Sequence, residues 1–153
     1  MGDLLNVAIN FFTEDNWPFT QLQDQPILKL GFQGESGQWS CYAQAREEQA
    51  QFLFYSVCPV KAPEDRHTAV AEFLTRANYG LFIGNFELDF SDGEIRYKTS
   101  IAVEGSQLSP ALVKPLVYAN VLMMDRYLPG IMSVIYGSIP PAEAVAEAEG
   151  TTD

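Results

Sequence analysis

Two runs of alternating apolar residues place the strongest constraint on how this chain can fold. Apolar side chains occur at every second position in residues 28–32 and again in residues 39–45. A period of two puts such side chains on one face of a β-strand. The segment from Gly34 to Gly37 between the runs is rich in turn-forming residues and has the length of a hairpin loop. The sequence therefore predicts an antiparallel hairpin with one buried face.

Further strands are predicted on both sides of this hairpin. A short strand is expected at residues 19–23, before it. Residues 52–57 are apolar at nearly every position, which indicates a central strand or a strand whose second face is also covered.

A second hairpin is predicted around the Asp92-Gly93 dipeptide, which favours a two-residue type I′ turn. Such a turn would fix the register of the two strands. We expect four cross-strand pairs, two buried and two charged: Phe90 with Ile95, Leu88 with Tyr97, Asp89 with Arg96, and Glu87 with Lys98.

Three helices complete the pattern. The spacing of apolar residues predicts a first helix over residues 3–13, with Asp3 as its N-cap, and a second helix from Pro63 to Gly80. The third begins at Ser109-Pro110, and Pro129-Gly130 is expected to break or kink it.

The predicted fold class is therefore α+β, with the order helix, three or four strands, helix, two strands, helix. We expect a twisted antiparallel sheet of five to six strands with helices packed mainly on one side. The chain has 153 residues, which suits a single domain. We assign the domain to residues 1–139 and expect the acidic, Ala- and Glu-rich residues 140–153 to be disordered.

Charge and composition limit the partners and the location. The formal net charge is −11 at pH 7 and only nine Lys and Arg are present. Nucleic acid and membrane surfaces are therefore not expected as partners, and acidity is expected to favour basic or amphipathic segments. The N-terminal residues lack the basic region of a signal peptide, and the most apolar stretch, residues 116–135, contains Asp125 and Arg126. We expect a cytoplasmic protein.

The residue types that carry catalysis or bind metal are sparse. His67 is the only histidine, and no second group in its sequence surroundings would orient it as a base. Cys41 and Cys58 lie in apolar runs and are interpreted as reduced, structural thiols. The acids Glu87 and Asp89 already have predicted basic partners. We therefore expect no enzymatic activity, no metal and no cofactor.

The chain carries more apolar side chains than a small sheet with a few helices needs. The excess lies in residues 52–57 and in the helix over residues 109–128. It indicates a homodimer or a groove for another protein chain, unless the monomer covers both segments itself. The candidate contact residues all lie in the last helical region: Tyr118, Leu122, Met123, Tyr127 and Met132. The alternative is a small-ligand sensor with an apolar pocket between the sheet and this helix.

Three segments resemble the YbjN-domain family, particularly its cyanobacterial members: residues 72–81, 84–98 and 124–132. The resemblance implies a fold similar to that of the small, acidic type III secretion chaperones. It also implies a regulatory role, because family members are often labelled sensory-transduction or stress regulators, and it provides no catalytic residues. Together with the residues themselves, it predicts a non-enzymatic, protein-binding module that is chaperone-like or regulatory.

Overall fold

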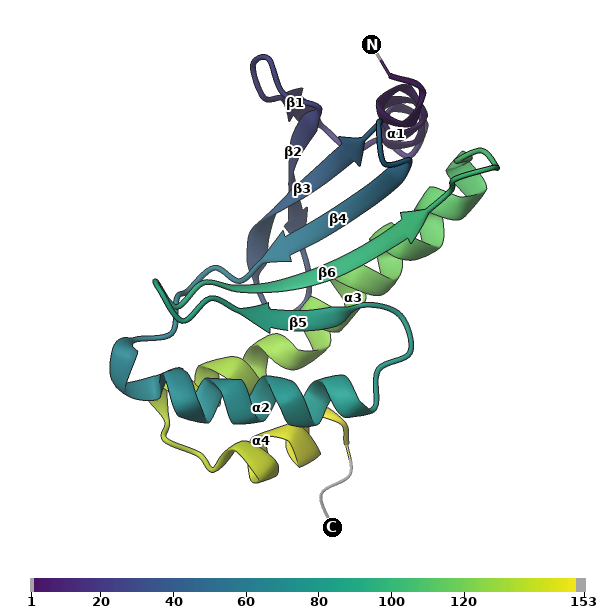
Figure 1. Cartoon of the computed structure of the whole chain (residues 1–153). Coiled ribbons are helices and arrows are strands. Elements are labelled where there is room, and N and C mark those ends of the chain that lie inside the picture. The colour runs from purple at the N-terminus through teal and green to yellow at the C-terminus, as the bar shows by residue number, and fades with distance from the viewer. Residues whose placement is uncertain (1, 151–153) are drawn as a thin grey trace.

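The computed structural model describes residues 2–150, which form one six-stranded antiparallel sheet with helices on one of its faces (Figure 1). The strand order is β1-β2-β3-β4-β6-β5. The strands are β1 (Phe19–Gln21), β2 (Ile27–Gln33), β3 (Gln38–Arg46), β4 (Gln51–Val57), β5 (Asn85–Leu88) and β6 (Ile95–Ala102). The helices are α1 (Asp3–Glu14), the short 3-10 turn η1 (Glu64–Arg66), α2 (His67–Tyr79), α3 (Pro110–Tyr136) and α4 (Pro141–Ala148).

The first predicted hairpin is confirmed as β2 and β3. Leu30 pairs with Cys41, and the Gly34 N–H donates to the Gly37 carbonyl oxygen at 2.8 Å to close the turn. The turn is also held from α3, because the Asp125 carboxylate accepts from the backbone N–H groups of Glu35 and Ser36 at 3.0 and 2.8 Å. The short strand before this hairpin is present as β1.

The N-terminus of α1 is capped by a residue distant in sequence. Asp3 was expected to be the N-cap, but the cap position is Gly2 and no side chain of α1 caps it. Glu47, in the β3–β4 turn, accepts instead from the N–H groups of Leu4 and Leu5 at 3.1 and 3.0 Å. The expected cap was wrong because a carboxylate from another element reaches the free N–H groups and the positive end of the helix dipole.

The second hairpin forms, but its register differs from the prediction by two residues. Phe86 rather than Leu88 pairs with Tyr97, and Phe90 is 60% exposed beyond the end of β5. Asp89 accepts from the Ser91 N–H at 2.8 Å, and Asp92 accepts from the Glu94 N–H at 2.9 Å. These two successive side-chain turns widen the loop beyond two residues, so Asp89 caps the loop instead of pairing with Arg96.

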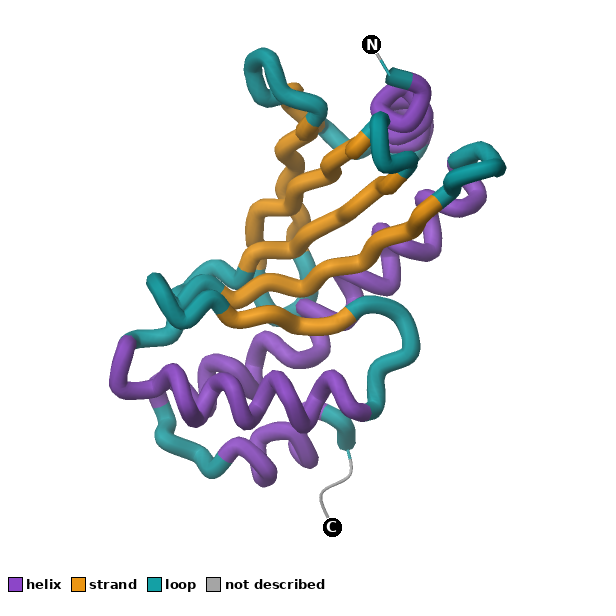
Figure 2. The backbone as a smooth tube through the Cα atoms, viewed as in Figure 1, coloured by secondary structure: helices purple, strands orange, loops and turns teal. Residues whose placement is uncertain are grey.

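Helix α3 continues through Pro129, where a break or kink was expected, and Figure 2 shows it as one continuous helix behind the sheet. Proline has no N–H to donate to the carbonyl four residues earlier, which here belongs to Asp125. The Ser36 hydroxyl donates to that carbonyl oxygen at 2.7 Å and replaces the missing bond. Tertiary structure therefore satisfies the group that the proline leaves without a partner.

The expectation of a disordered tail was wrong for residues 141–148, which form α4 and pack against α2 and α3. Ala144 and Val145 are buried there. The approach is close because Gly130 has no side chain: a Cβ at Gly130 would lie 2.6 Å from the Phe73 ring and 3.4 Å from the Ala144 carbonyl oxygen. Residues 151–153 of the predicted tail lie outside the described part of the chain.

One face of the sheet is covered by α1 and α3 and forms the core. Helix α3 is fixed to the sheet by Asn120, which is fully buried. Its Nδ2 donates to the carbonyl oxygens of Phe54 and Tyr97 at 2.8 and 3.0 Å. Figure 1 shows α2 lying alongside β5, with α4 beneath it. None of the helices within residues 2–150 lies on the opposite face of the sheet.

Candidate functional site

The uncovered face of the sheet is the surface that the fold leaves available. Successive side chains of a strand point to opposite faces of the sheet. Residues that pair with buried residues on a neighbouring strand therefore point into the core, and the residues between them point to the uncovered face. The outward residues of β4 are Gln51, Leu53, Tyr55 and Val57, all half-buried although none of the described helices covers them. The predicted central position of β4 is confirmed, whereas its second apolar face is open instead of covered.

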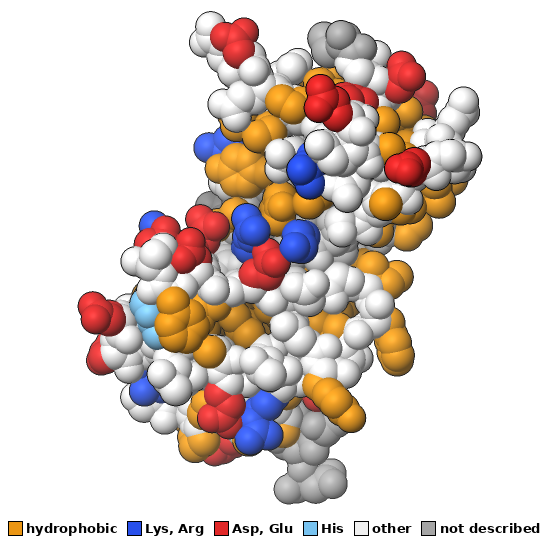
Figure 3. Space-filling view, viewed as in Figure 1, with side chains coloured by type: hydrophobic (Ala, Val, Ile, Leu, Met, Phe, Trp, Pro, Cys, Tyr) orange, Lys and Arg blue, Asp and Glu red, His pale blue; other side chains and the backbone are white. Residues whose placement is uncertain are grey.

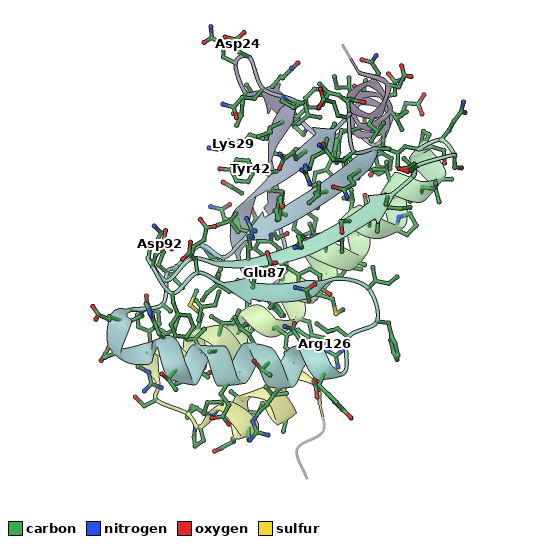
Figure 4. All side chains as sticks on the ribbon, in the orientation of Figure 1. Asp24, Lys29, Tyr42, Glu87, Asp92 and Arg126 are labelled. Atoms are coloured by element: carbon green, nitrogen blue, oxygen red, sulfur yellow. The ribbon has the colours of Figure 1, made fainter. Side chains whose placement is uncertain are left out.

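A row of aromatic and basic side chains crosses this face at right angles to the strands. Lys29 on β2 pairs with Tyr42 on β3, Tyr42 pairs with Tyr55 on β4, and Tyr55 pairs with Lys98 on β6. Figure 4 shows the labelled side chains of Lys29 and Tyr42 together at this part of the sheet. Two tyrosines thus lie between two lysines.

A charged cluster adjoins the row on β5 and β6. Glu87 lies between two cations, 2.7 Å from Arg96 Nε and 2.8 Å from Lys98 Nζ. Partial burial raises the pKa of Glu87, but the hydrogen bonds and charges of Lys98 and Arg96 outweigh it, so the pKa lies below its usual value. The Arg96 guanidinium also stacks on the Tyr55 ring, 4.3 Å from its centroid.

Two depressions flank Tyr42 and Val57, which line both of them. The larger, about 620 Å³, extends over Gly31 and Trp39 towards the end of β4. The smaller, about 290 Å³, extends over Tyr55 to Arg96 and Glu94, at the start of β6. Gly31 forms part of the floor of the larger one, and a Cβ built there meets nothing within 4 Å. The face is therefore hollowed and has space above its central strands.

The charge of this face is opposite to that of the whole molecule. The six strands contain four of the nine basic residues of the chain and one of its twenty acidic residues, and all five face outward: Lys29, Arg46, Arg96, Lys98 and Glu87. The rest of the chain has five bases and nineteen acids. Figure 3 shows basic side chains gathered over the middle of the sheet among hydrophobic ones, with acidic ones mostly at the margins. The acidity expected to select basic partners does not extend to this face.

The structure separates the five contact residues predicted on the last helix. Leu122 is 52% exposed, whereas Tyr127 is 1% exposed and donates through its hydroxyl to Glu149. Tyr118 is half-buried and donates to the Asp15 carboxylate. Met123 and Met132 are half-buried against the core. Because α3 lies on the covered face, it shares no surface with the row of tyrosines.

Sequence reasoning missed the uncovered face, although its signal was present. Tyr42 and Tyr55 occupy polar-side positions of predicted strands, where large aromatic residues are not required by the core. The sequence showed the nearly continuous apolar run of residues 52–57, but without the strand order nothing connected it with Tyr42 or Lys29. Pairing across strands joins residues that are far apart in the sequence.

The other residues considered for chemistry lie apart from one another. His67 Nε2 is 3.0 Å from the Ala62 carbonyl oxygen, and the ring contacts Phe90. Cys41 and Cys58 are free and buried, and burial raises the pKa of their thiols to about 12 and about 11. Within residues 2–150, no three His, Cys, Asp or Glu side chains are grouped as metal ligands would be.

A separate apolar patch lies at the end of α2 and in the loop that leads to β5. Phe82 is fully exposed, Tyr79 is 96% exposed, and Ile83 is 47% exposed.

None of the described helices is long and apolar enough to span a membrane.

These features define a class of protein: an α+β domain with one face of an antiparallel sheet covered by helices and the other face open. The family model described as "Putative bacterial sensory transduction regulator", YbjN, matches residues 9–132. The chain belongs to the YbjN family. A search of curated proteins found no match.

Solved structures support the same fold. The structure described as "YbjN, a putative transcription regulator from E. coli" superimposes with a TM-score of 0.62 at 12% identity, covering 79% of this chain and 85% of that chain. A chain of the ExsC–ExsE complex gives a TM-score of 0.59 at 13% identity, covering 84% of this chain and 96% of that chain. The expected similarity to the type III secretion chaperone fold is confirmed.

Proposed function

We propose that this chain is a cytoplasmic, non-enzymatic protein-binding module whose contact surface is the uncovered face of the sheet. The observation that carries the proposal is the row of Tyr42 and Tyr55 on the open side of the two strands β3 and β4. Half-exposed tyrosines beside hollowed, apolar surface are typical of protein interfaces, since they provide contact area with little loss of side-chain entropy. The chaperone-like fold supports this function, because one solved neighbour, the ExsC–ExsE complex, is an assembly of two proteins.

The alternative function, a small-ligand sensor with a pocket between the sheet and α3, receives less support. Asn120 forms direct hydrogen bonds across that interface, and Thr99 donates to the Leu116 carbonyl oxygen at 2.9 Å. Those bonds draw α3 onto the sheet where a ligand would have to lie. The described depressions that adjoin the tyrosines are on the other face.

Affinity capture from the native cytosol, with two matched glycine variants, tests the proposal. Gly31→Gln places a neutral side chain in the larger depression without a clash and should abolish the captured set. Gly80→Gln is the control, because Gly80 follows α2 and its Cβ also meets nothing within 4 Å. Equal capture by both variants would contradict the assignment of the site.

The contact surface predicted from the sequence on α3 is the competing location. Leu122 is its most exposed candidate, whereas Tyr127 is buried. If capture depends on α3, Leu122→Asp should abolish it while Gly31→Gln leaves it intact. The opposite result supports the uncovered face.

The homodimer remains a prediction. Light scattering coupled to size-exclusion chromatography measures it directly, and the exposed side chains of Tyr79 and Phe82 are the apolar groups that a second copy could cover. A dimer that persists when Phe82 is changed to Ser would place the interface elsewhere. A monomer at all concentrations would contradict the prediction.

A further inference from the structure

We infer that the partner bound on the uncovered face is an acidic, extended protein segment, with carboxylates on either side of an aromatic or apolar residue. This inference rests on the proposed function and specifies its partner. It reverses the expectation from net charge, under which an acidic protein selects basic segments.

The charge of the face is the first argument. Within the strands, four cations face outward with one carboxylate, and that carboxylate, Glu87, is already bound by Arg96 and Lys98. Lys29 has no ion-pair partner among the described residues although the chain carries twenty acids. Asp89 and Glu94 adjoin Arg96 at one end of this face, and the four cations still outnumber the three carboxylates. This surplus of positive charge, on the sheet face that no described helix covers, complements a negatively charged partner.

The geometry of Arg96 is the second argument. Its Nε donates to Glu87 and its guanidinium carbon lies over the Tyr55 ring, so two contacts restrain the guanidinium. Within the part of the chain that the structure describes, its two terminal nitrogens have no hydrogen-bond partner. An arginine held in this way is prepared to bind a carboxylate through both terminal nitrogens at a small cost in entropy.

The spacing of the row gives the length of the segment. Lys29 and Lys98 are separated by three strand intervals, which is about 14 Å at the usual distance between paired strands. An extended chain advances about 3.3 Å per residue, so carboxylates about four residues apart would reach both lysines. The residue midway between them would then lie over Tyr42 and Tyr55.

Single-stranded nucleic acid is the other anionic polymer that an aromatic and basic sheet can bind, and the structure favours it less. The ring face of Tyr55 that a base would stack on is occupied by Arg96. The remainder of the chain, with five bases and nineteen acids, would repel a long polyanion. A short acidic segment of a protein avoids both obstacles.

Selection from a displayed library of random peptides of about ten residues, long enough to cross the sheet, tests the inference. The intact protein is the bait. We expect enriched peptides to carry Asp or Glu about four residues apart around an aromatic or apolar residue. An enriched peptide is then synthesised with its acids and with Gln in place of Glu, and both forms are titrated by fluorescence anisotropy.

Protein variants provide the second measurement. Lys29→Gln and Lys98→Gln should each weaken binding of the acidic peptide about fivefold, and together about 25-fold, whereas Lys114→Gln on α3 should leave it unchanged. Raising the salt concentration from about 0.05 to about 0.5 M should weaken binding of the acidic peptide to the unaltered protein by about as much as the double substitution does. The Gln-containing peptide should bind weakly to the unaltered protein and to every variant.

The remaining outcomes separate the inference from the proposed function. Enriched neutral or basic peptides whose binding is lost in Gly31→Gln would overturn the inference and leave the face as a protein-binding site. Failure to enrich any peptide, with capture unaffected by Gly31→Gln, would overturn both. A thymidine oligonucleotide that competes with the peptide and depends equally on Lys29 and Lys98 would overturn the inference in favour of nucleic acid.

Discussion

The side-chain amide of Asn78 binds both backbone polar groups of Phe86, at the free edge of the sheet. Asn78 Oδ1 accepts from the Phe86 N–H at 2.7 Å, and Asn78 Nδ2 donates to the Phe86 carbonyl oxygen at 3.1 Å. An exposed edge strand is a template for pairing with another chain. The amide of Asn78, on α2, therefore occupies the position that a further strand would take and closes this edge.

Replacing Asn78 with Ala should destabilise the protein and promote its self-association. Loss of the two hydrogen bonds should lower the free energy of unfolding by about 1–2 kcal/mol, measured by urea denaturation. The freed edge of β5 should increase concentration-dependent association, measured by light scattering. The control is Asn6→Ala on the exposed side of α1. Unchanged association in the Asn78 variant would show that α2 itself is enough to cover the edge.

Asp125→Asn should lower the free energy of unfolding at neutral pH. It should also make the free energy of unfolding depend less on pH in the acidic range. Partial burial raises the pKa of Asp125, but hydrogen bonds from Ser36 and from the Ser36 and Glu35 backbone outweigh it, so the folded-state pKa is lowered. A lowered pKa gives stability that is present above the unfolded-state value of about 4 and lost as pH falls through the folded-state value.

The expected loss in Asp125→Asn is about 1–2 kcal/mol at pH 7, and it should shrink as the pH falls below about 5. Urea denaturation at several pH values measures this difference, with the exposed Asp24→Asn as control. A difference that stays constant down to pH values of about 2 would contradict the assigned role of the carboxylate.

Glu47→Ala should weaken α1 although Glu47 lies outside that helix. Its carboxylate caps two N–H groups and lies at the positive end of the helix dipole, so we expect a loss of about 1–2 kcal/mol in stability. Glu48→Ala changes the next residue of the same turn and serves as the matched control. Equal stabilities of the two variants by thermal or urea unfolding would show that the cap contributes nothing measurable.

Gly130→Ala should loosen the packing of α2, α3 and α4. The added methyl group would lie 2.6 Å from the buried Phe73 ring, so we expect a destabilisation of about 1–3 kcal/mol despite the better helix propensity of Ala. Gly80→Ala, where space is open, should be nearly neutral. Limited proteolysis of the C-terminal segment should be faster in the Gly130 variant, and an unaltered rate would argue against α4 docking on Gly130.

Most of the fold could be predicted from local pattern. Alternation placed β2 and β3, helical spacing placed α1 and α2, and the short turn between Gly34 and Gly37 set the first hairpin. The second hairpin was correctly located but given the wrong register. Hydrophobic alternation is satisfied equally by a shift of two residues, and the side-chain bonds of Asp89 and Asp92 that select the longer loop are not encoded in that alternation.

The cap of α1, the continuity of α3 at Pro129 and the order of the tail could not be predicted for a different reason. The capping group of α1 comes from Glu47, and the group that satisfies the free carbonyl in α3 comes from Ser36. The close packing of α4 depends on Gly130, which lies beside Phe73 and Ala144. Each depends on residues that are distant in sequence. No local window contains both partners.

The sequence by itself determined the class of fold, every strand and helix except α4, and the family, because hydrophobic period, turn residues and helix signals act between neighbours in the chain. Only the tertiary structure decided which of the surplus apolar side chains, on the central strand or on the last long helix, are exposed. It buried Tyr127 on α3 and left Tyr42 and Tyr55 on an open face between Lys29 and Lys98. The physical reason is that strand order and helix placement determine which face of a sheet is removed from water, and both are properties of the whole chain.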